Sequence, residues 1–224
     1  MNGNGASSGR SAAATRERLL DTAERLFAER GYEGTSLRAL ADAAEANIAA
    51  VNYHFRSKEG LLQAVVARAM TPVNAERERR LASLNTSGGH PTIEQLVRAF
   101  VEPGLDLVDH HGDRGPAVAR FIGRVLFDPS PRIRQLFADQ VDPVEGRYLD
   151  ALRLALPAHD TDTILFGYTT MLGMLALQQA ATFTPVRWRL VSGQTRADEA
   201  AAREEDRERL IAFLTAGLIH GLAR

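Results

Sequence analysis

The chain has 224 residues, of which 45% are hydrophobic and 25% are charged, and this balance is typical of a globular protein. It contains no cysteine, which excludes disulfide bonds, thiolate nucleophiles and cysteine-ligated metal centres. No apolar run approaches the ~18 residues that a membrane-spanning helix requires, and residues 1–10 lack the apolar stretch of a secretory signal. We therefore expect a cytoplasmic protein without a membrane partner, and nothing in the composition indicates a cofactor.

The net charge of −1 does not by itself indicate a nucleic-acid partner. Lys58 is the only lysine, whereas arginine is frequent throughout the chain, so a single arginine carries little information. Affinity for a polyanion would have to come from where the charges lie and not from their sum.

The N-terminus is predicted to form a disordered arm over residues 1–14, followed by an amphipathic helix. Thr15 is a candidate N-cap for this helix, and Gly31 is a candidate for its C-terminal end. Between them, apolar residues recur at intervals of three and four positions and so share one helical face: Leu19, Ala23, Leu26 and Phe27.

Three more helices are expected between residues 35 and 71, each preceded by a side chain that can cap it. The candidate caps are the pair Thr35–Ser36, then Asn47, then Ser57. The helix after Asn47 is short, and the helix after Ser57 has a long apolar face and leads away from this unit. The pair Thr71–Pro72 predicts that the fourth helix is interrupted or kinked there.

The rest of the chain also has helical periodicity, after a predicted linker at residues 85–91. Residues 185–202 are predicted to form a loop, within which residues 185–191 are ambiguous between loop and strand. The sequence therefore predicts an all-α protein of about nine helices, with a first unit at residues 15–60 and a second at residues 61–224. Helices of the second unit are expected over residues 92–110, 116–127, 131–156, 160–184 and 203–222.

The segment from Thr35 to Leu62 has the order of a helix-turn-helix motif: a helix, a tight turn and a short second helix. A short helix of this kind fits the major groove of DNA, which is about 12 Å wide. Small side chains at its start permit close approach to base edges, and alanine and isoleucine can contact thymine methyl groups. The residues at its exposed start are Asn47, Ile48, Ala49 and Ala50, and the polar residues that would reach phosphates are Tyr53, His54 and Lys58.

Residues 14–59 resemble the DNA-binding unit of the TetR family of bacterial repressors. The resemblance rests on an ordered set of motifs: ATR at 14–16, LFAERGY at 26–32, TSLR at 35–38, VNYHF at 51–55 and SKE at 57–59. It implies that residues 47–50 and Asn52 lie near bases and that Arg38 belongs to the DNA-binding surface. It also implies that DNA phosphates are contacted by the side chains of Thr35, Ser36, Tyr53, His54 and Lys58.

The resemblance further implies a homodimeric regulator that binds a double-stranded DNA operator, acts mainly as a repressor and is not an enzyme. A small-molecule effector would favour a conformation whose two DNA-binding units are wrongly spaced for consecutive major grooves. Two positions depart from the family pattern: Glu45 replaces the usual turn glycine, and Asn52 stands where the first tyrosine of a Leu-Tyr pair is usual. Because few side chains at 47–50 can hydrogen-bond to bases, part of the specificity is expected to come from DNA shape.

The last two predicted helices are candidates for the subunit interface, because two helices from each subunit would form a four-helix contact. A symmetric pair is also what a two-fold operator requires, with its half-sites about 34–36 Å apart. The alternative is that the same side chains form the chain's own core. The candidate residues are Leu165, Tyr168, Leu172, Leu175, Gln179, Leu210, Phe213, Leu214, Leu218 and Ile219.

Large apolar side chains in the C-terminal half are candidates for lining an effector cavity, with an ordinary core as the alternative. Arg120 and Arg124 lie one turn apart and can clamp a carboxylate or a phosphate, or else form a solvated face. The segments AAVNYHF (49–55) and LFDPSPRIRQLF (126–137) are similar to a fatty-acid-sensing, PsrA-like branch of the family, which implies a fatty acid or an acyl-CoA as effector. The candidate lining residues are Phe100, Phe121, Phe127, Phe137, Tyr148, Phe166, Met171 and Met174.

A second hypothesis is a helical ligand-binding or metal-dependent enzymatic protein in which the helix-turn-helix is only structural. Its basis is the sequence DHHGD at residues 109–113, which contains metal-capable side chains. Adjacent histidines on a helix point in different directions, unlike an i, i+4 pair. We therefore interpret this segment as a polar helix end and expect no metal there.

Overall fold

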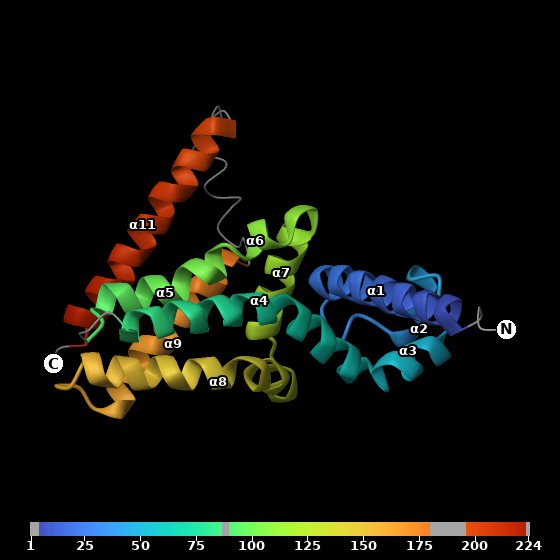
Figure 1. The fold of residues 1–224 in the computed structure, drawn as a ribbon, viewed down its shortest axis with the longest axis horizontal. Coiled ribbons are helices and arrows are strands. Elements are labelled where there is room, and N and C mark those ends of the chain that lie inside the picture. The colour runs from blue at the N-terminus through green and yellow to red at the C-terminus, as the bar shows by residue number, and fades with distance from the viewer. Residues whose placement is uncertain (1–4, 87–89, 180–195, 223–224) are drawn as a thin grey trace.

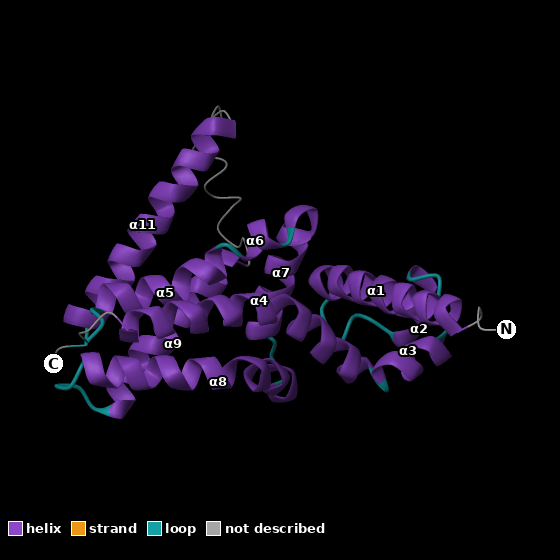
Figure 2. Cartoon of the chain, viewed as in Figure 1, coloured by secondary structure: helices purple, strands orange, loops and turns teal. Residues whose placement is uncertain are grey.

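The computed structural model describes the backbone of residues 5–86, 90–179 and 196–222, and this part of the chain contains helices and no strand (Figures 1 and 2). The all-α class predicted from the sequence is confirmed. The helices are α1 (Gly5–Arg30), α2 (Leu37–Ala43), α3 (Ile48–Phe55), α4 (Lys58–Thr86), α5 (Ile93–Leu105), α6 (Leu107–His110), the 3-10 turn η1 (Gly112–Arg114), α7 (Gly115–Leu126), α8 (Pro131–Ala155), α9 (Thr161–Gln179) and α11 (Arg196–His220).

Side-chain caps fix where the short N-terminal helices begin. The Ser36 hydroxyl accepts from the Ala39 amide at 3.1 Å, and the Asn47 side-chain oxygen accepts from the Ala50 amide at 2.7 Å. Ser57 caps α4 by accepting from the backbone N–H of residue 60 at 3.0 Å. These contacts confirm the predicted caps, each of which satisfies a backbone donor that the helix itself leaves unpaired.

Helix α1 is longer than the sequence predicted. It begins at Gly5, so the predicted arm is wrong over residues 5–14, while residues 1–4 lie outside the described residues. Thr15 lies inside the helix and does not cap it, and its hydroxyl donates to the Ser11 carbonyl at 3.0 Å. The Ala- and Ser-rich sequence here has no apolar face, but alanine is the strongest helix former and allows the extra turns. The end of the helix was predicted correctly, at Gly31 with φ of 74°.

The C-terminal helices differ from the prediction at three places. Helix α4 continues through Pro72, which is exposed, as far as Thr86. The helix expected over 92–110 is divided at Asp106 into α5 and α6. Residues 196–202 belong to α11 and not to a loop. The remaining part of that predicted loop, with the ambiguous segment 185–191, lies outside the described residues.

The buried side chains form two hydrophobic clusters, and the division between them does not follow the predicted domain boundary at residue 60. The first cluster joins α1, α2 and α3 to the first half of α4, to α6 and α7, and to the first half of α8. The second joins the rest of α8 to α5, α9 and α11. Helix α4 contributes to both, and Figure 1 shows it running from the N-terminal helices into the C-terminal bundle.

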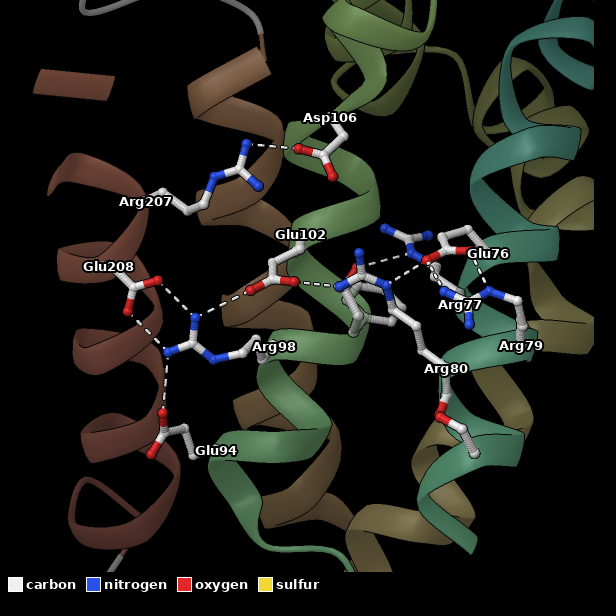
Figure 3. Close-up of polar contacts among 12 residues, drawn as sticks. Glu76, Arg77, Arg79, Arg80, Glu94, Arg98, Glu102, Asp106, Arg207 and Glu208 are labelled. Atoms are coloured by element: carbon white, nitrogen blue, oxygen red, sulfur yellow. Dashed lines mark hydrogen bonds and ion pairs between the residues drawn. The ribbon is translucent and has the colours of Figure 1, made fainter. Parts of the chain in front are cut away.

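Charged side chains attach α11 and α4 to opposite sides of α5 (Figure 3). The Arg98 guanidinium of α5 contacts Glu208 of α11 at 2.6 Å and also contacts Glu94 and Glu102 of its own helix. Arg80 of α4 pairs with Glu102 from the other side. Single exposed ion pairs stabilise little, but a shared network of this kind fixes how three helices lie against one another.

A buried carboxylate connects the N-terminal helices to the C-terminal bundle. Glu24 of α1 is 2% exposed, and its carboxylate contacts Arg68 of α4 at 2.7 Å and Arg114 of η1 at 3.4 Å. Asp21, one turn earlier, contacts the same two arginines at 2.7 and 3.2 Å. Because a buried charge is costly unless it is paired, these arginines hold α1 against α4 and η1.

We predict that Glu24→Gln lowers the free energy of unfolding by about 3 kcal/mol, because it leaves the two arginines without their buried counter-charge. Glu29→Gln is the matched control: Glu29 lies on the same helix, is exposed and pairs with Arg25 at 3.4 Å. Its removal should cost below about 0.5 kcal/mol. Urea unfolding of the two variants gives both numbers, and equal losses would contradict the assigned role of Glu24.

The turn between α2 and α3 contains a strained residue. Glu45 has φ of 50°, a left-handed conformation that glycine adopts more readily than residues with a side chain. We predict that Glu45→Gly stabilises the protein by about 1 kcal/mol. Glu45→Ala, which keeps a Cβ and therefore the strain, should give no such gain. Thermal unfolding of both variants tests this, and a larger gain for alanine would refute the strain argument.

Candidate nucleic-acid interface and ligand pocket

One side of α3 is buried and the other faces solvent. Val51 and Phe55 are buried against the first hydrophobic cluster. Tyr53 is 80% exposed and Ile48 is 43% exposed. The exposed residues are spaced as one helical face and include most of those expected near DNA: Ile48, Ala49, Asn52 and Tyr53, with Ala50 partly buried behind them.

Several of the expected DNA contacts also have structural tasks. The side-chain oxygens of Ser36 and Asn47 accept the capping hydrogen bonds. These bonds hold both side chains in fixed orientations at the surface. Arg38 is exposed on α2. The ring of His54 is half-buried and lies 5.0 Å from the ring of Tyr53. These residues are at least partly exposed and lie within the helix-turn-helix segment.

The phosphate contact expected for the Thr35 side chain is wrong. Thr35 is 1% exposed, and its hydroxyl lies 2.8 Å from the Gly31 carbonyl and 3.3 Å from the Leu26 carbonyl, to which it can donate. These contacts tie the turn before α2 to the end of α1. The threonine therefore stabilises the helix-turn-helix from inside.

Lys58 lies in the first turn of α4 against an aromatic ring. Its ammonium is 3.9 Å from the centre of the Tyr32 ring, a cation–π contact, and partial burial lowers its pKa. The contact holds the cation at the helix N-terminus, where free backbone donors also favour an anion. The geometry is suitable for a phosphate.

Sequence reasoning missed two arginines of α1 that contact the helix-turn-helix. Arg16 of α1 places its guanidinium 5.5 Å from the centre of the Phe55 ring, and Arg18 donates to the Ala44 carbonyl at 3.3 Å. Both side chains are exposed. Their position depends on how α1 packs against the motif. The sequence does not single them out, because arginine is frequent throughout the chain.

The residues expected to line an effector cavity are divided between three environments. Phe121 and Phe137 are buried in the first cluster, and Phe100, Tyr148 and Met171 in the second, with Met174 packed against it. Four others face solvent, so the predicted clamp and part of the predicted lining are wrong: Arg120, Arg124, Phe127 and Phe166.

A small cavity lies where the two hydrophobic clusters meet. Its volume is about 10 Å³, roughly the space of one water molecule. Its lining includes one of the predicted ligand residues, Phe137. The lining also includes two charged residues that the prediction missed, Arg77 and Glu145. The rest of the lining is Met70, Ile122, Leu126, Val141, Leu172, Leu175 and Ala176.

The predicted dimer residues divide into an exposed and a buried set. Leu165, Phe213 and Ile219 are 39%, 63% and 43% exposed, and Phe166, predicted as a ligand residue, is 67% exposed beside Leu165. The buried set belongs to the chain's own core, so these five were wrongly assigned to an interface: Tyr168, Leu175, Leu210, Leu214 and Leu218. Leu172 is half-buried, and the side chain of Gln179 lies outside the described residues.

The segment behind the metal hypothesis gives it no support. His110 is exposed, whereas His111 is half-buried and burial lowers its pKa. Among the described residues, no group of three or more His, Asp or Glu side chains gathers as a metal site would require. No described helix combines the length and the apolarity needed to span a bilayer.

Comparison with known proteins identifies both halves of the chain. Residues 19–65 match the family described as bacterial regulatory proteins, tetR family. Residues 98–217 match the family described as tetracyclin repressor-like, C-terminal domain.

Among curated proteins, the chain is 26% identical over 125 residues to the "Probable HTH-type transcriptional regulator YttP" of Bacillus subtilis, covering 55% of this chain and 56% of YttP. It is 39% identical over 75 residues to the HTH-type transcriptional repressor ComR of Escherichia coli, covering 34% of this chain and 36% of ComR. The matched region thus spans about half of YttP and about a third of ComR.

Among solved structures, NalD, the secondary repressor of the MexAB-OprM multidrug efflux pump in Pseudomonas aeruginosa, superposes with a TM-score of 0.59. Its sequence identity is 19%, and the match covers 92% of this chain and 97% of NalD, so it shows a shared fold. Both halves of the chain match TetR family models, and the structure has the capped, exposed α3 of a helix-turn-helix. The chain therefore belongs to the TetR family of transcriptional regulators.

Proposed function

We propose that the protein is a homodimeric repressor that binds a DNA operator through α3 and leaves it when a small apolar molecule binds the C-terminal bundle. The observation that carries the proposal is the exposed face of α3, held rigidly from behind by Val51 and Phe55. No catalytic step is part of this proposal.

The chemistry of this face suits the major groove. Ile48 and Ala49 offer apolar contacts for thymine methyl groups, while Asn52 offers an amide that can pair with adenine. Basic and hydroxyl groups on α1, α2, α3 and the start of α4 are candidates for phosphate contacts, which would fix the register of the helix on the duplex. They include Arg16, Arg18, Arg38, Tyr53, His54 and Lys58.

Operator binding is tested by gel shift with the DNA upstream of the protein's own gene. A scrambled duplex of the same length and composition is the control. We expect selective binding of the upstream DNA that weakens steeply as salt rises, because phosphate contacts release bound counterions. Equal affinity for both duplexes at every salt concentration would contradict the proposal.

We predict that Tyr53→Phe and Lys58→Ala each weaken operator binding, by roughly threefold to tenfold, because each loses one contact to phosphate. Tyr53 is exposed, so its substitution should leave the melting temperature unchanged, and Lys58→Ala should lower it only slightly through loss of the Tyr32 contact. Arg153→Ala, an exposed residue on α8, is the control for a change outside the interface. Loss of folding in parallel with loss of DNA binding would refute the phosphate assignment.

The exposed apolar residues of α9 and α11 support a subunit interface at these helices. Leu165, Phe166, Phe213 and Ile219 leave large apolar side chains in water, which is costly on a monomer. Exposed small residues lie within four positions of them on the two helices and would let a partner helix approach closely: Thr169, Thr170, Ala212 and Ala216. The same surface on a second copy would be its natural cover, as in an isologous dimer.

We predict that the double substitution Phe166→Glu with Phe213→Glu converts the dimer to monomers, because it buries two carboxylates in an apolar contact. Light scattering coupled to size-exclusion chromatography gives the mass. Leu154→Glu is the matched control, since Leu154 is 68% exposed on α8. A monomeric Leu154→Glu, or a double variant that stays dimeric, would place the interface elsewhere.

For the effector we propose an acyl compound, a fatty acid or an acyl-CoA, in keeping with the similarity of residues 126–137 to a fatty-acid-sensing branch of the family. The cavity between the two clusters supports a site in the C-terminal bundle, since its lining is mostly apolar. Its small volume means that an acyl chain would have to part α4, α7, α8 and α9 in order to enter. That movement would change the position of the N-terminal helices, which share the first cluster with α7.

A further inference from the structure

Arg77 is a buried arginine with no described carboxylate in ion-pair contact, although Glu145 of the same cavity is near enough to attract its charge. Arg77 is 3% exposed. Its Nε donates to the Phe100 carbonyl at 3.0 Å, and its guanidinium lies 3.8 Å from the centre of the Phe100 ring. The hydrogen bond from Nε is a side-chain hydrogen bond that Arg77 makes within the described residues.

The neighbouring arginines are different. Arg79 and Arg80, on the same helix, both pair with Glu76, and Figure 3 shows Arg77 beside them. Arg98 contacts three carboxylates. The most buried arginine of this region is thus the one without a described carboxylate in direct contact. Burial of an unpaired cation costs several kcal/mol, so a chain that retains it is expected to use the charge.

The surroundings of Arg77 form one end of the cavity. Arg77 and Glu145 are its charged lining residues, and the remaining lining is apolar. Glu145 lies on α8, beyond ion-pair distance from Arg77, and burial raises the pKa of its carboxyl group. Gly104 of α5 leaves space for the guanidinium, because a Cβ there would lie 3.3 Å from Arg77 Nη2 and 2.7 Å from Leu175 Cδ2.

We propose that the effector is a carboxylate with an apolar body, whose carboxylate binds the Arg77 guanidinium and whose body occupies the junction between the two hydrophobic clusters. This deepens the ligand response suggested above and rests on it. The planar fork of an arginine matches a carboxylate with two parallel hydrogen bonds, and a low-dielectric site strengthens them. The apolar lining then selects acids with a hydrocarbon body over small polar acids.

The position also explains how the ligand would act. The lining includes Met70 and Ile122 from the first cluster and Leu175 from the second, so a body placed between them separates the two. Met70 and Arg77 both lie on α4 and line the cavity. Arg68, two residues before Met70 on the same helix, pairs with Glu24 of α1. A shift of α4 at the cavity is therefore passed directly to the helices that carry α3.

Binding is tested by isothermal calorimetry and thermal shift on the purified full chain without DNA. The probes are octanoate, octanol and octylammonium, which share one body and differ in charge. We expect octanoate alone to raise the melting temperature, by roughly 5 °C at a hundredfold excess over its Kd. Stabilisation by octylammonium or octanol equal to that by octanoate would overturn the assignment of a carboxylate.

Arg77→Gln is expected to weaken octanoate binding by about tenfold to a hundredfold, because it removes charge-assisted hydrogen bonds. Without ligand it should be at least as stable as the wild type, since a buried unpaired charge is removed. Arg79→Gln, an exposed arginine on the same helix, should bind octanoate as the wild type does. Unchanged octanoate affinity in Arg77→Gln would overturn the proposal.

Glu145→Gln tests the same site without altering Arg77. It removes the like charge that faces the ligand, so it should tighten octanoate binding severalfold. Weaker octanoate binding in this variant would overturn the proposed orientation of the ligand. Because these measurements contain no DNA and the operator gel shift contains no octanoate, failure of the ligand assignment is distinguishable from failure of the repressor proposal.

Discussion

The contact of Glu24 with Arg68 and Arg114 is the interaction on which the rest of the structure depends. It joins α1, which supports the DNA-facing helix, to α4 and η1 of the C-terminal bundle. The paired charges are partly withdrawn from water, so any relative movement of these helices would break contacts that are costly to lose. The N-terminal helices therefore move with the start of α4 and α7 and not independently of them.

The hydrophobic core joins α1 and α4, as this ion-pair contact does. The first hydrophobic cluster includes α1, α2 and α3 together with α7 and the first half of α8, so a boundary at residue 60 would cut through it. The second cluster, in contrast, contains the helices with exposed apolar faces that we propose for the dimer. A ligand between the clusters would thus act between a part that faces DNA and a part that faces the other subunit.

The sequence predicted the starts of the three capped helices of the N-terminal unit because their signals are local. A capping side chain and the residues it caps are three positions apart, and the caps by Ser36, Asn47 and Ser57 were found where they were expected. Thr35 was misassigned because burial depends on how the turn packs on α1, and nothing in the adjacent residues shows this.

The C-terminal half was harder because its signals are not local. Whether an apolar residue on α9 faces the core or a partner depends on which helix covers it. Tyr168 and Phe166 were both predicted functional residues, but Tyr168 is buried and Phe166 is exposed.

One signal for the cavity was present in the sequence and was missed. Arg77 interrupts a stripe of buried residues on α4 at helical spacing, and a charge in such a stripe suggests either a buried partner or a ligand. The stripe is Val66, Met70, Val73, Arg77 and Leu81.

In the proposed dimer, occupancy of the cavity sets the distance between the two DNA-binding units. The chain has no cysteine, so Asn52→Cys on the exposed face of α3 introduces a single spin label in each subunit. Pulsed electron paramagnetic resonance then gives the distance between the two α3 helices. We expect a distribution near the half-site spacing of about 34–36 Å without ligand, and a shift on addition of octanoate that is absent when Arg77→Gln is also present. An unchanged distribution with octanoate bound, or no dipolar coupling between labels, would contradict the account.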